Sequence, residues 1–187
     1  VMGFCDVVGI ATSHIKADFN LSEAMAGFIP SMVFIWFLIL SLPSALLMNR
    51  FGRKTMVQVS NIITFVGMLI PFFVYNFVSC MIGFVLLGVG NTILQVSLNP
   101  LLTNVVKGDK LTSSLTVGQV IKAISSLCGP FIALGAVQVF GSWEYLFPVF
   151  ALITLLAWVL LFFTQIDEEP VQKEQKGSAL AAFGLLK

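Results

Sequence analysis

Residues 24–48 read AMAGFIPSMVFIWFLILSLPSALLM and contain no charged side chain. A helix needs about 20 consecutive apolar residues to cross a hydrocarbon core about 30 Å thick, so this stretch is long enough to span a lipid bilayer. Further apolar runs lie before and after it, separated by short polar segments: 1–14, 56–75, 79–102, 111–140 and 145–164. The sequence therefore predicts an all-α integral membrane protein that forms a bundle of six transmembrane helices.

The composition also indicates a membrane protein. Hydrophobic residues make up 58% of the chain and charged residues 10%, whereas a soluble domain carries about 45–50% and about 25% respectively. The net charge is +1, and the basic residues are scattered between the apolar runs instead of forming one patch. This pattern excludes a nucleic-acid partner. We expect the partners to be the lipid bilayer and small molecules.

Few residues offer catalytic or metal-binding chemistry. The chain has one histidine and three cysteines, with no CxxC pair. Cys5, Cys80 and Cys128 each lie in or beside an apolar run, and we interpret them as small buried hydrophobic residues. The sequence has no glycine-rich phosphate loop and no nucleophile with a neighbouring base. We expect a protein that is not an enzyme, holds no metal or cofactor and is not driven directly by ATP.

Basic residues are concentrated on one side of the predicted bundle. Only Lys16 falls in a loop on the other side, and the positive-inside rule makes the basic side cytoplasmic. Both ends of this chain are then cytoplasmic, with residues 1–165 as an N-terminal six-helix bundle and residues 166–187 as a polar cytoplasmic linker. Trp143 and Tyr145 suit an aromatic belt at a membrane interface. The basic residues assigned to the cytoplasmic side are Arg50, Arg53, Lys54, Lys107, Lys110, Lys173, Lys176 and Lys187.

The loop that follows the quoted stretch carries a motif. Residues 45–54 read ALLMNRFGRK, which resembles the Gly-x-Leu-Ala-Asp-Arg-x-Gly-Arg-Lys signature of the major facilitator superfamily. Gly52 permits a tight turn, and the basic side chains can hold the loop at the cytoplasmic face and engage carboxylates or helix C-termini. Ala45 and Asn49 stand where the signature has Gly and Asp, and an ordinary positive-inside loop is the alternative. The resemblance implies a conformational loop comprising Asn49, Arg50, Gly52, Arg53 and Lys54.

Amide side chains recur at a helical spacing in the fourth run. Asn91, Gln95 and Asn99 are four residues apart and share one face of a helix, which cannot face lipid. They either hold helices together or line a watery cavity, where neutral donors and acceptors suit an uncharged polyol. In the fifth run Gln119 and Lys122 also share a face, where the lysine could bond a solute hydroxyl. We take these amides and Lys122 as candidate substrate-binding residues.

Two charged residues lie within the apolar runs, Asp6 in the first and Lys122 in the fifth. A charge at a helix centre costs about 2.5–3.5 kcal/mol on insertion scales, so each residue must face the bundle interior or water. A carboxylate there can take a proton from one side and release it to the other as access alternates, which makes Asp6 the candidate proton-coupling residue. A structural ion pair between Asp6 and Lys122 is the alternative.

Residues 88–100 and 112–122 resemble the fucose permease-like branch of the superfamily, whose members include bacterial proton-coupled sugar symporters. The resemblance implies the N-terminal half of a twelve-helix fold with a 3+3 inverted repeat, joined to a C-terminal six-helix bundle of the same protein in the bacterial inner membrane, a plasma membrane. It implies a secondary active transporter that takes up a monosaccharide or similar neutral solute together with a proton. The carboxylates of that branch are replaced here by Gly9-Ile10 and Gln95. A proton-linked efflux antiporter of amphipathic compounds and a non-transporting membrane receptor or scaffold are the alternatives.

Overall fold

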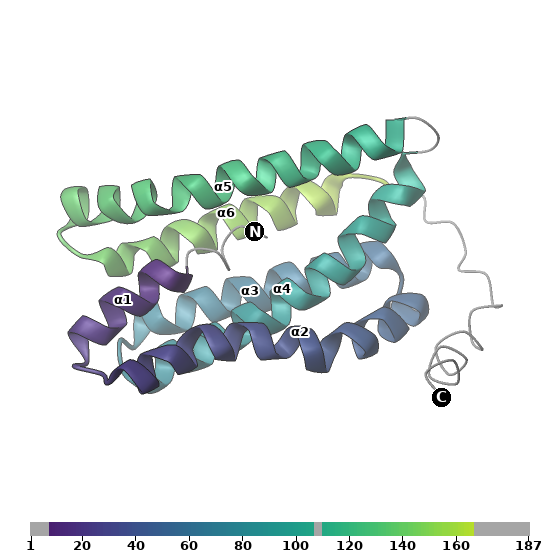
Figure 1. Cartoon of the computed structure of the whole chain (residues 1–187). Coiled ribbons are helices and arrows are strands. Elements are labelled where there is room, and N and C mark those ends of the chain that lie inside the picture. The colour runs from purple at the N-terminus through teal and green to yellow at the C-terminus, as the bar shows by residue number, and fades with distance from the viewer. Residues whose placement is uncertain (1–7, 107–109, 167–187) are drawn as a thin grey trace.

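The computed structural model describes residues 8–106 and 110–166 (Figure 1). Within these ranges the chain forms six α-helices and one short 3-10 helix, η2, which leads directly into the last helix. The stretches 23–51, 53–73, 77–105, 110–140 and 143–163 are each long and apolar enough to cross a membrane. The prediction of an all-helical membrane bundle is therefore confirmed. The elements are α1 (Val8–Asp18), α2 (Glu23–Phe51), α3 (Arg53–Phe73), α4 (Phe77–Val105), α5 (Lys110–Phe140), η2 (Trp143–Tyr145) and α6 (Leu146–Phe163).

The first helix differs from its predicted run. That run was expected at residues 1–14, whereas α1 continues past His14 to Asp18. The polar residues in its last turn do not end the helix, because they lie at the end of the bundle where water can solvate them. Residues 1–7, which include Asp6 and Cys5, lie outside the described part of the chain, as do residues 167–187 of the expected linker. Of the other cysteines, Cys80 is buried as expected and Cys128 is exposed.

One glycine separates α2 from α3. Gly52 has φ 90°, and its N–H donates to the carbonyl oxygen of Met48 across 3.0 Å, which closes the last turn of α2. A side chain on an L-residue opposes this backbone conformation, whereas glycine adopts it freely. The turn therefore reverses the chain direction within a single residue and brings the start of α3 beside the end of α2.

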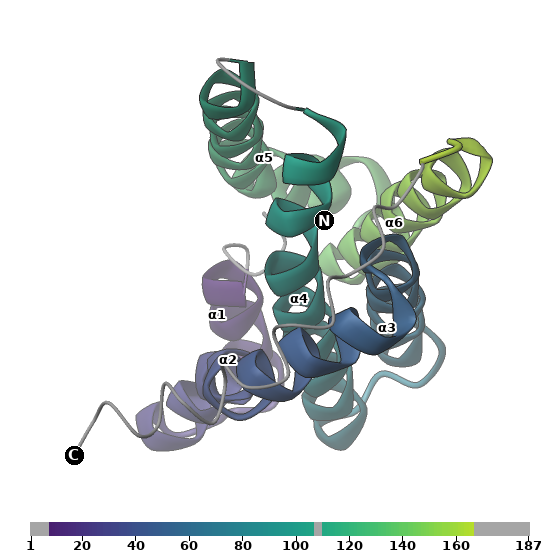
Figure 2. The same ribbon diagram turned by 90° about the vertical axis from the view of Figure 1, so that its right-hand side faces the viewer.

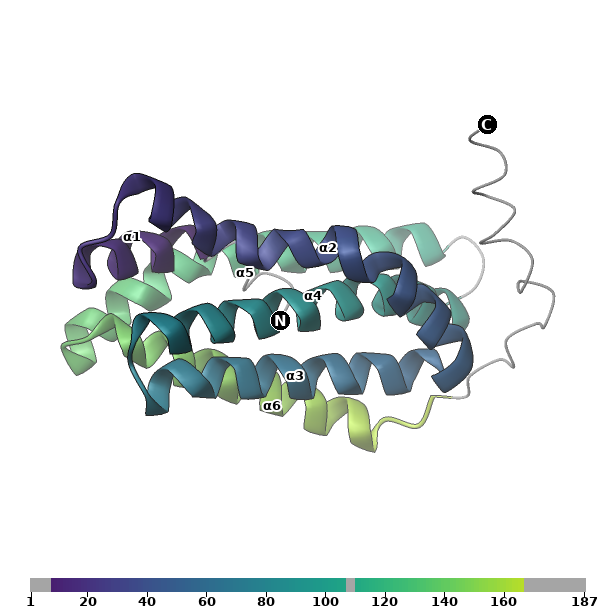
Figure 3. The same ribbon diagram turned by 90° about the horizontal axis from the view of Figure 1, so that it is seen from below.

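Helix α4 lies in the middle of the bundle. It packs mainly against α2 and α3, while α3 also packs against α6, an arrangement visible in Figure 3 and, along the helices, in Figure 2. Small residues allow the close approach. A Cβ added at Gly88 would lie 2.4 Å from the Val33 carbonyl oxygen of α2, and one added at Gly90 would lie 2.3 Å from Thr64 Oγ1 of α3. Close backbone packing of this kind holds membrane helices together where lipid supplies little hydrophobic drive.

Helix α5 is the least closely packed of the long helices. Its contacts are mainly with η2 near its own C-terminal end, and those with α4 and α6 are sparse. Most of its large apolar side chains are exposed, among them Ile121, Ile124 and Leu127. Because lipid or another protein surface can cover such a face, the exposure is compatible with a membrane setting. The separation of α5 from α4 leaves room for a cavity between them.

Candidate solute-binding site

A cavity of about 360 Å³ lies between α3, α4, α5 and α6. Its volume is within the range of about 300–1,000 Å³ that is usual for small-molecule sites. The wall is largely apolar, with polar side chains contributed by α3 and α5. Such a site combines an apolar surface with a few groups that orient a ligand. The lining residues are Val57, Asn61, Leu94, Leu98, Gly118, Ile121, Lys122, Ser125, Ala157 and Leu161.

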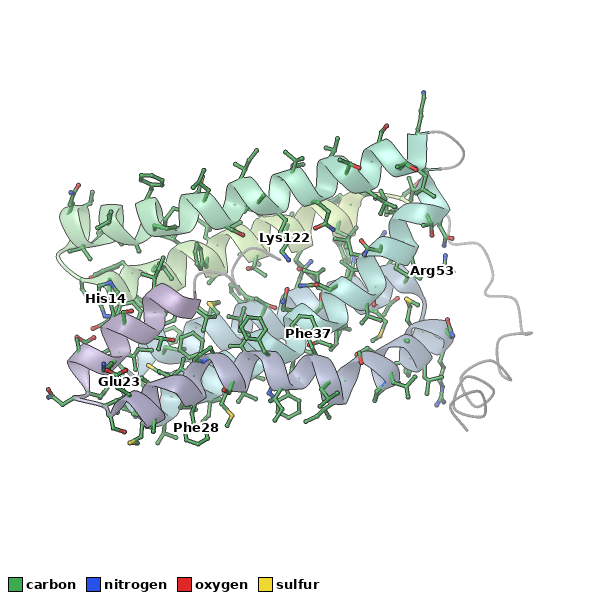
Figure 4. The ribbon with its side chains drawn as sticks, viewed as in Figure 1. His14, Glu23, Phe28, Phe37, Arg53 and Lys122 are labelled. Carbon is green, nitrogen blue, oxygen red and sulfur yellow. The ribbon has the colours of Figure 1, made fainter. Side chains whose placement is uncertain are left out.

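Lys122 is the charged residue of this lining. The residue is half-buried, and Figure 4 shows its side chain pointing from α5 towards the helices on the other side of the bundle. With a rise of about 1.5 Å per residue, Lys122 lies about 18 Å along α5 from Lys110, well inside the membrane-spanning part. Within the described residues its ammonium group has no ion-pair partner. The expected alternative of a pair with Asp6 lies outside those residues.

Asn61 lies opposite, on α3, and was not identified from the sequence. Only 3% of it is exposed, it lines the cavity, and its side-chain oxygen has no hydrogen-bond partner among the described residues. The spacing of Val57, Asn61, Thr64 and Met68 by four, three and four residues places all of them on one face of α3, and all are buried. That face is the inner one. The signal available in the sequence was the pair Ser60-Asn61 within an otherwise apolar run.

Asn91 lies deeper, on α4. It is 1% exposed, and neither its amide oxygen nor its amide nitrogen has a partner in the described part of the chain. Leu94, one turn after Asn91 on the same inner face, lines the cavity. Leu87, one turn before Asn91, lines a small apolar pocket against α1. A buried amide without a partner costs about 1–3 kcal/mol. Asn91 is therefore a buried amide whose hydrogen-bonding groups are satisfied by no described residue.

Of the predicted substrate-binding residues only Lys122 lines this cavity among the described residues, and Asn91 does not. Gln95 is half-buried, and Asn99 and Gln119 are exposed in this bundle. The amides of α4 lie four residues apart, and each such step rotates by about 400°, so Asn99 lies about 80° around the helix from Asn91. The structure therefore brings Lys122 and Asn61 together at the cavity, with Asn91 on the face between the two pockets.

A second depression, of about 530 Å³, lies at the turn between α1 and α2 and is lined by Ser13, Lys16, Ala17, Asn20 and Leu21. Lys16 is already paired there with Glu23, which is 87% exposed. Ions on such an exposed surface are well solvated and bind solutes weakly. In residues 8–106 and 110–166 no cluster of His, Cys, Asp and Glu side chains is large enough to hold a metal ion.

The basic loop ties together the helix ends at one end of the bundle. Arg53 Nη1 donates to the Pro100 carbonyl oxygen across 3.2 Å and also to Asn104 Oδ1, and Figure 4 shows Arg53 at this end of the bundle. Lys54 Nζ donates to the Thr164 carbonyl oxygen, at the end of α6, across 2.5 Å. These contacts place positive charge on the carbonyl ends of α4 and α6, as the helix dipole favours.

The remaining loop residues lie at the end of α2. Arg50 is exposed, and its guanidinium lies 5.4 Å from the centre of the Phe51 ring. Asn49 is half-buried. Neither Arg50 nor Asn49 is seen to join α2 to another helix in the part of the chain that the structure describes.

The opposite end of the bundle is held by a carboxylate. Asp18, at the end of α1, accepts hydrogen bonds from the Tyr75 hydroxyl at 2.6 Å and from Trp143 Nε1 at 2.8 Å. His14 stacks on the Trp143 ring with centroids 5.1 Å apart. Trp143 is only 6% exposed and packs within this end of the bundle, whereas Tyr145 is 39% exposed. The interfacial belt stays a prediction. The indole turns inward because Asp18 supplies an acceptor there.

Comparison with known proteins gives one family and several relatives. The model of the Major Facilitator Superfamily matches residues 2–187. The chain is 24% identical over 176 residues to a hexuronate transporter of Bacillus subtilis (strain 168), which covers 94% of this chain and 41% of the relative. It is 29% identical over 136 residues to a glucose/galactose transporter of Brucella abortus biovar 1 (strain 9-941), which covers 71% of this chain and 32% of the relative. The chain thus matches less than half the length of these relatives.

Proposed function

Because the chain belongs to the major facilitator superfamily, a family of membrane transporters and not of enzymes, we propose that it forms the N-terminal six-helix half of a proton-coupled importer of a monosaccharide or similar polyhydroxy solute. The C-terminal six-helix bundle of the same protein and the lipid bilayer would be its structural partners. The protein would act in the plasma membrane of a bacterium, which is its inner membrane. The Arg53 end of the bundle would face the cytoplasm.

The cavity beside Lys122 and Asn61 carries this proposal. It presents an ammonium donor and an amide oxygen without a partner among the described residues, set in an apolar wall. Hydroxyl groups donate to such an oxygen and accept from such an ammonium, while the CH face of a sugar ring packs on leucine side chains. The names of the relatives, a hexuronate transporter and a glucose/galactose transporter, point to the same class of solute.

The remaining polar residues fit a surface that a second bundle covers. Asn99 and Gln119 are exposed in this half, and a second bundle would cover side chains that lipid cannot solvate. Both ends of the half are tied, by Arg53 at one end and by Asp18 at the other. A half braced at both ends would move as one rigid body, as alternating access between two bundles requires.

Asp6 is the proposed proton carrier. A carboxylate in a medium of low dielectric constant takes up a proton readily, and alternating access would let it load on one side and unload on the other. The largely apolar cavity wall also favours a second candidate, a proton-linked efflux antiporter of amphipathic compounds. The two differ in the direction of solute movement and in the chemistry of the solute.

The test uses the full-length protein in lightly buffered, de-energised cells, with external pH recorded as a panel of sugars is added. We expect one sugar to make the medium alkaline, and Asp6→Asn to abolish that signal. Glu23→Gln, which changes an exposed carboxylate, is the control and should leave the signal intact. A folded, membrane-inserted protein that gives no pH change with any sugar would remove sugar symport and leave efflux as the candidate.

A further inference from the structure

We propose that the solute carries a carboxylate as well as hydroxyl groups, and that Lys122 binds this carboxylate in the cavity between α3, α4, α5 and α6. The inference rests on the proposed function, because it names the solute class for the same site. It replaces the expectation of an uncharged polyol.

The lining of the cavity carries one positive charge, which no described residue compensates. Lys122 is the sole ionisable side chain among the ten described residues that line it. Its ammonium has no ion pair and no side-chain hydrogen bond within residues 8–106 and 110–166. A cation in a membrane-spanning segment is retained at a considerable cost in free energy unless an anion or water compensates it. A carboxylate brought by the solute would supply that compensation.

The acids of the described chain cannot supply it. Within residues 8–106 and 110–166 they are Asp18, Glu23 and Glu144, and all three lie at the end of the bundle opposite to Arg53. Asp18 is bonded to Tyr75 and Trp143, and Glu23 is paired with Lys16. Among the described residues the cavity therefore carries positive charge, while the acids lie at the far end of the bundle. An anionic solute is attracted to such a cavity and a cationic solute is repelled.

Asn61 adds the need for a hydroxyl group. Its side-chain oxygen is an acceptor, so it repels a carboxylate and accepts a hydrogen bond from a hydroxyl. Asn61 is only 3% exposed and lines the cavity. Its side-chain oxygen has no hydrogen-bond partner among the described residues. A ligand with an anionic acceptor and a hydroxyl donor would compensate the Lys122 ammonium and satisfy the Asn61 oxygen together. Sugar acids have both groups, and hexose-sized members suit a volume of about 360 Å³.

A neutral sugar would satisfy only part of this site. A hydroxyl oxygen can accept a hydrogen bond from Lys122, but it brings no charge to compensate that of the ammonium. Charge-assisted hydrogen bonds are about twice as strong as neutral ones. Selectivity for the acid over the matching neutral sugar should therefore depend on Lys122.

The experiment compares sugars that differ only at C6. The full-length transporter is reconstituted in proteoliposomes, and uptake of radiolabelled galacturonate and galactose, and of glucuronate and glucose, is measured for the wild type, Lys122→Gln, Lys122→Arg and Lys110→Gln. We expect the wild type to prefer one of the acids to its neutral counterpart. Lys122→Gln should raise the KM for that acid by about 10- to 100-fold, the range of a charge-assisted hydrogen bond. Lys122→Arg should retain part of the preference.

The control Lys110→Gln and one further variant, Asn61→Leu, complete the test. Lys110→Gln removes an exposed lysine at the start of the same helix and should leave both KM values within about threefold of the wild type. Asn61→Leu keeps a similar volume and removes the acceptor for a hydroxyl, so it should weaken uptake of the acid and of the neutral sugar together. If Lys122→Gln fails to accumulate in the membrane, Lys122→Arg should still show a reduced preference for the acid. Asn61→Leu should still show weaker uptake of both sugars.

The outcomes separate this inference from the proposed function. Proton-linked uptake of a neutral sugar with no preference for its acid overturns the inference and leaves sugar symport standing. An equal loss of both sugars in Lys122→Gln also overturns it. Restoration of uptake by adding Asp6→Asn to Lys122→Gln assigns Lys122 to a structural ion pair, so it overturns the inference and also removes Asp6 as the proton carrier. Failure of every sugar, neutral or acidic, removes the proposed function itself.

Discussion

Trp143 donates its indole N–H to the Asp18 carboxylate across 2.8 Å, although the two residues are 125 positions apart. Tyr75 donates to the same oxygen at 2.6 Å. One carboxylate therefore joins the end of α1, the turn between α3 and α4, and the start of η2. Trp143, Phe147 and Tyr75 pack around this junction. The polar bonds thus lie over an aromatic cluster that caps the apolar core at this end of the bundle.

Trp143→Phe should weaken the bundle. The substitution keeps an aromatic ring and removes the donor to Asp18, and loss of such a bond should lower the free energy of unfolding by about 1 kcal/mol. Equilibrium unfolding in mixed micelles measures the change. The matched control is Trp36→Phe, because the indole N–H of Trp36 is buried with no partner among the described residues. A loss in Trp36→Phe equal to that in Trp143→Phe would show that ring volume, and not the bond to Asp18, is responsible.

The Tyr75 junction should also make stability depend on alkaline pH. Burial, followed by the hydrogen bond to Asp18, raises the pKa of the Tyr75 phenol above its ordinary value of 10.0. Below that value the phenol is protonated in both the folded and the unfolded chain, so its contribution to stability is fully present. As the pH rises further, the unfolded chain loses the proton first, and the free energy of unfolding falls.

The measurement for Tyr75 compares unfolding of the wild type and Tyr75→Phe between pH 8 and 11. All other ionisable groups are the same in both proteins, so the difference between the two curves isolates the phenol. We expect the stability of the wild type to fall more steeply above about pH 10 than that of Tyr75→Phe. Parallel curves would mean that the phenol titrates alike in the folded and the unfolded chain.

Arg53 and Asn104 should be coupled energetically. Arg53 Nη1 bonds both the Asn104 side-chain oxygen and the Pro100 carbonyl oxygen, which fastens the start of α3 to the end of α4. A double-mutant cycle with Arg53→Gln and Asn104→Ala should give a coupling free energy of about 1 kcal/mol in thermal or micellar unfolding. Arg50→Gln is the control, since Arg50 is exposed and stands over Phe51 of its own helix. Additive effects of the Arg53 and Asn104 substitutions would contradict the contact.

Most of the fold could be predicted from the lengths of the apolar runs. The run at 24–48 became Glu23–Phe51, and the run at 111–140 became Lys110–Phe140. Hydropathy suffices because a lipid-exposed chain must satisfy its backbone hydrogen bonds within each helix. Contacts between distant residues could not be predicted in this way. The inward turn of Trp143 depends on Asp18, a residue far away in the sequence, and no local pattern reports such a partner.

The candidate site could be predicted only in part. Lys122 was identified because a charged side chain within an apolar run must face the bundle interior or water. Asn61 was missed, since one amide without a repeat gives no periodic signal, although its burial and its place in the cavity are clear in the structure. The spacing of Asn91 and Asn99 indicated one shared face, but an exact four-residue repeat drifts around the helix and takes Asn99 out of the interior. The sparse packing of α5 is a property of the assembled bundle.

Asn91→Leu should separate stability from transport. The amide is 1% exposed and has no partner for its oxygen or its nitrogen among the described residues. A leucine of similar size removes a desolvation cost of about 1–3 kcal/mol, so the variant should unfold at the same or a higher temperature. If the amide serves a solute or the water that hydrates it, uptake should fall by about tenfold or more, as expected where function retains a group that folding does not need.

The control for Asn91 is its neighbour Thr92. Thr92 is fully buried as well, but its hydroxyl donates to the Gly88 carbonyl oxygen of its own helix across 2.8 Å. Thr92→Val keeps the shape and removes a bond that the helix does not require, so uptake should change little. Thermal unfolding in detergent and initial rates of solute uptake are measured for both variants. Wild-type uptake by Asn91→Leu would make the amide a structural contact between helices, whereas lost uptake in a protein of undiminished stability would place it on the path of the solute.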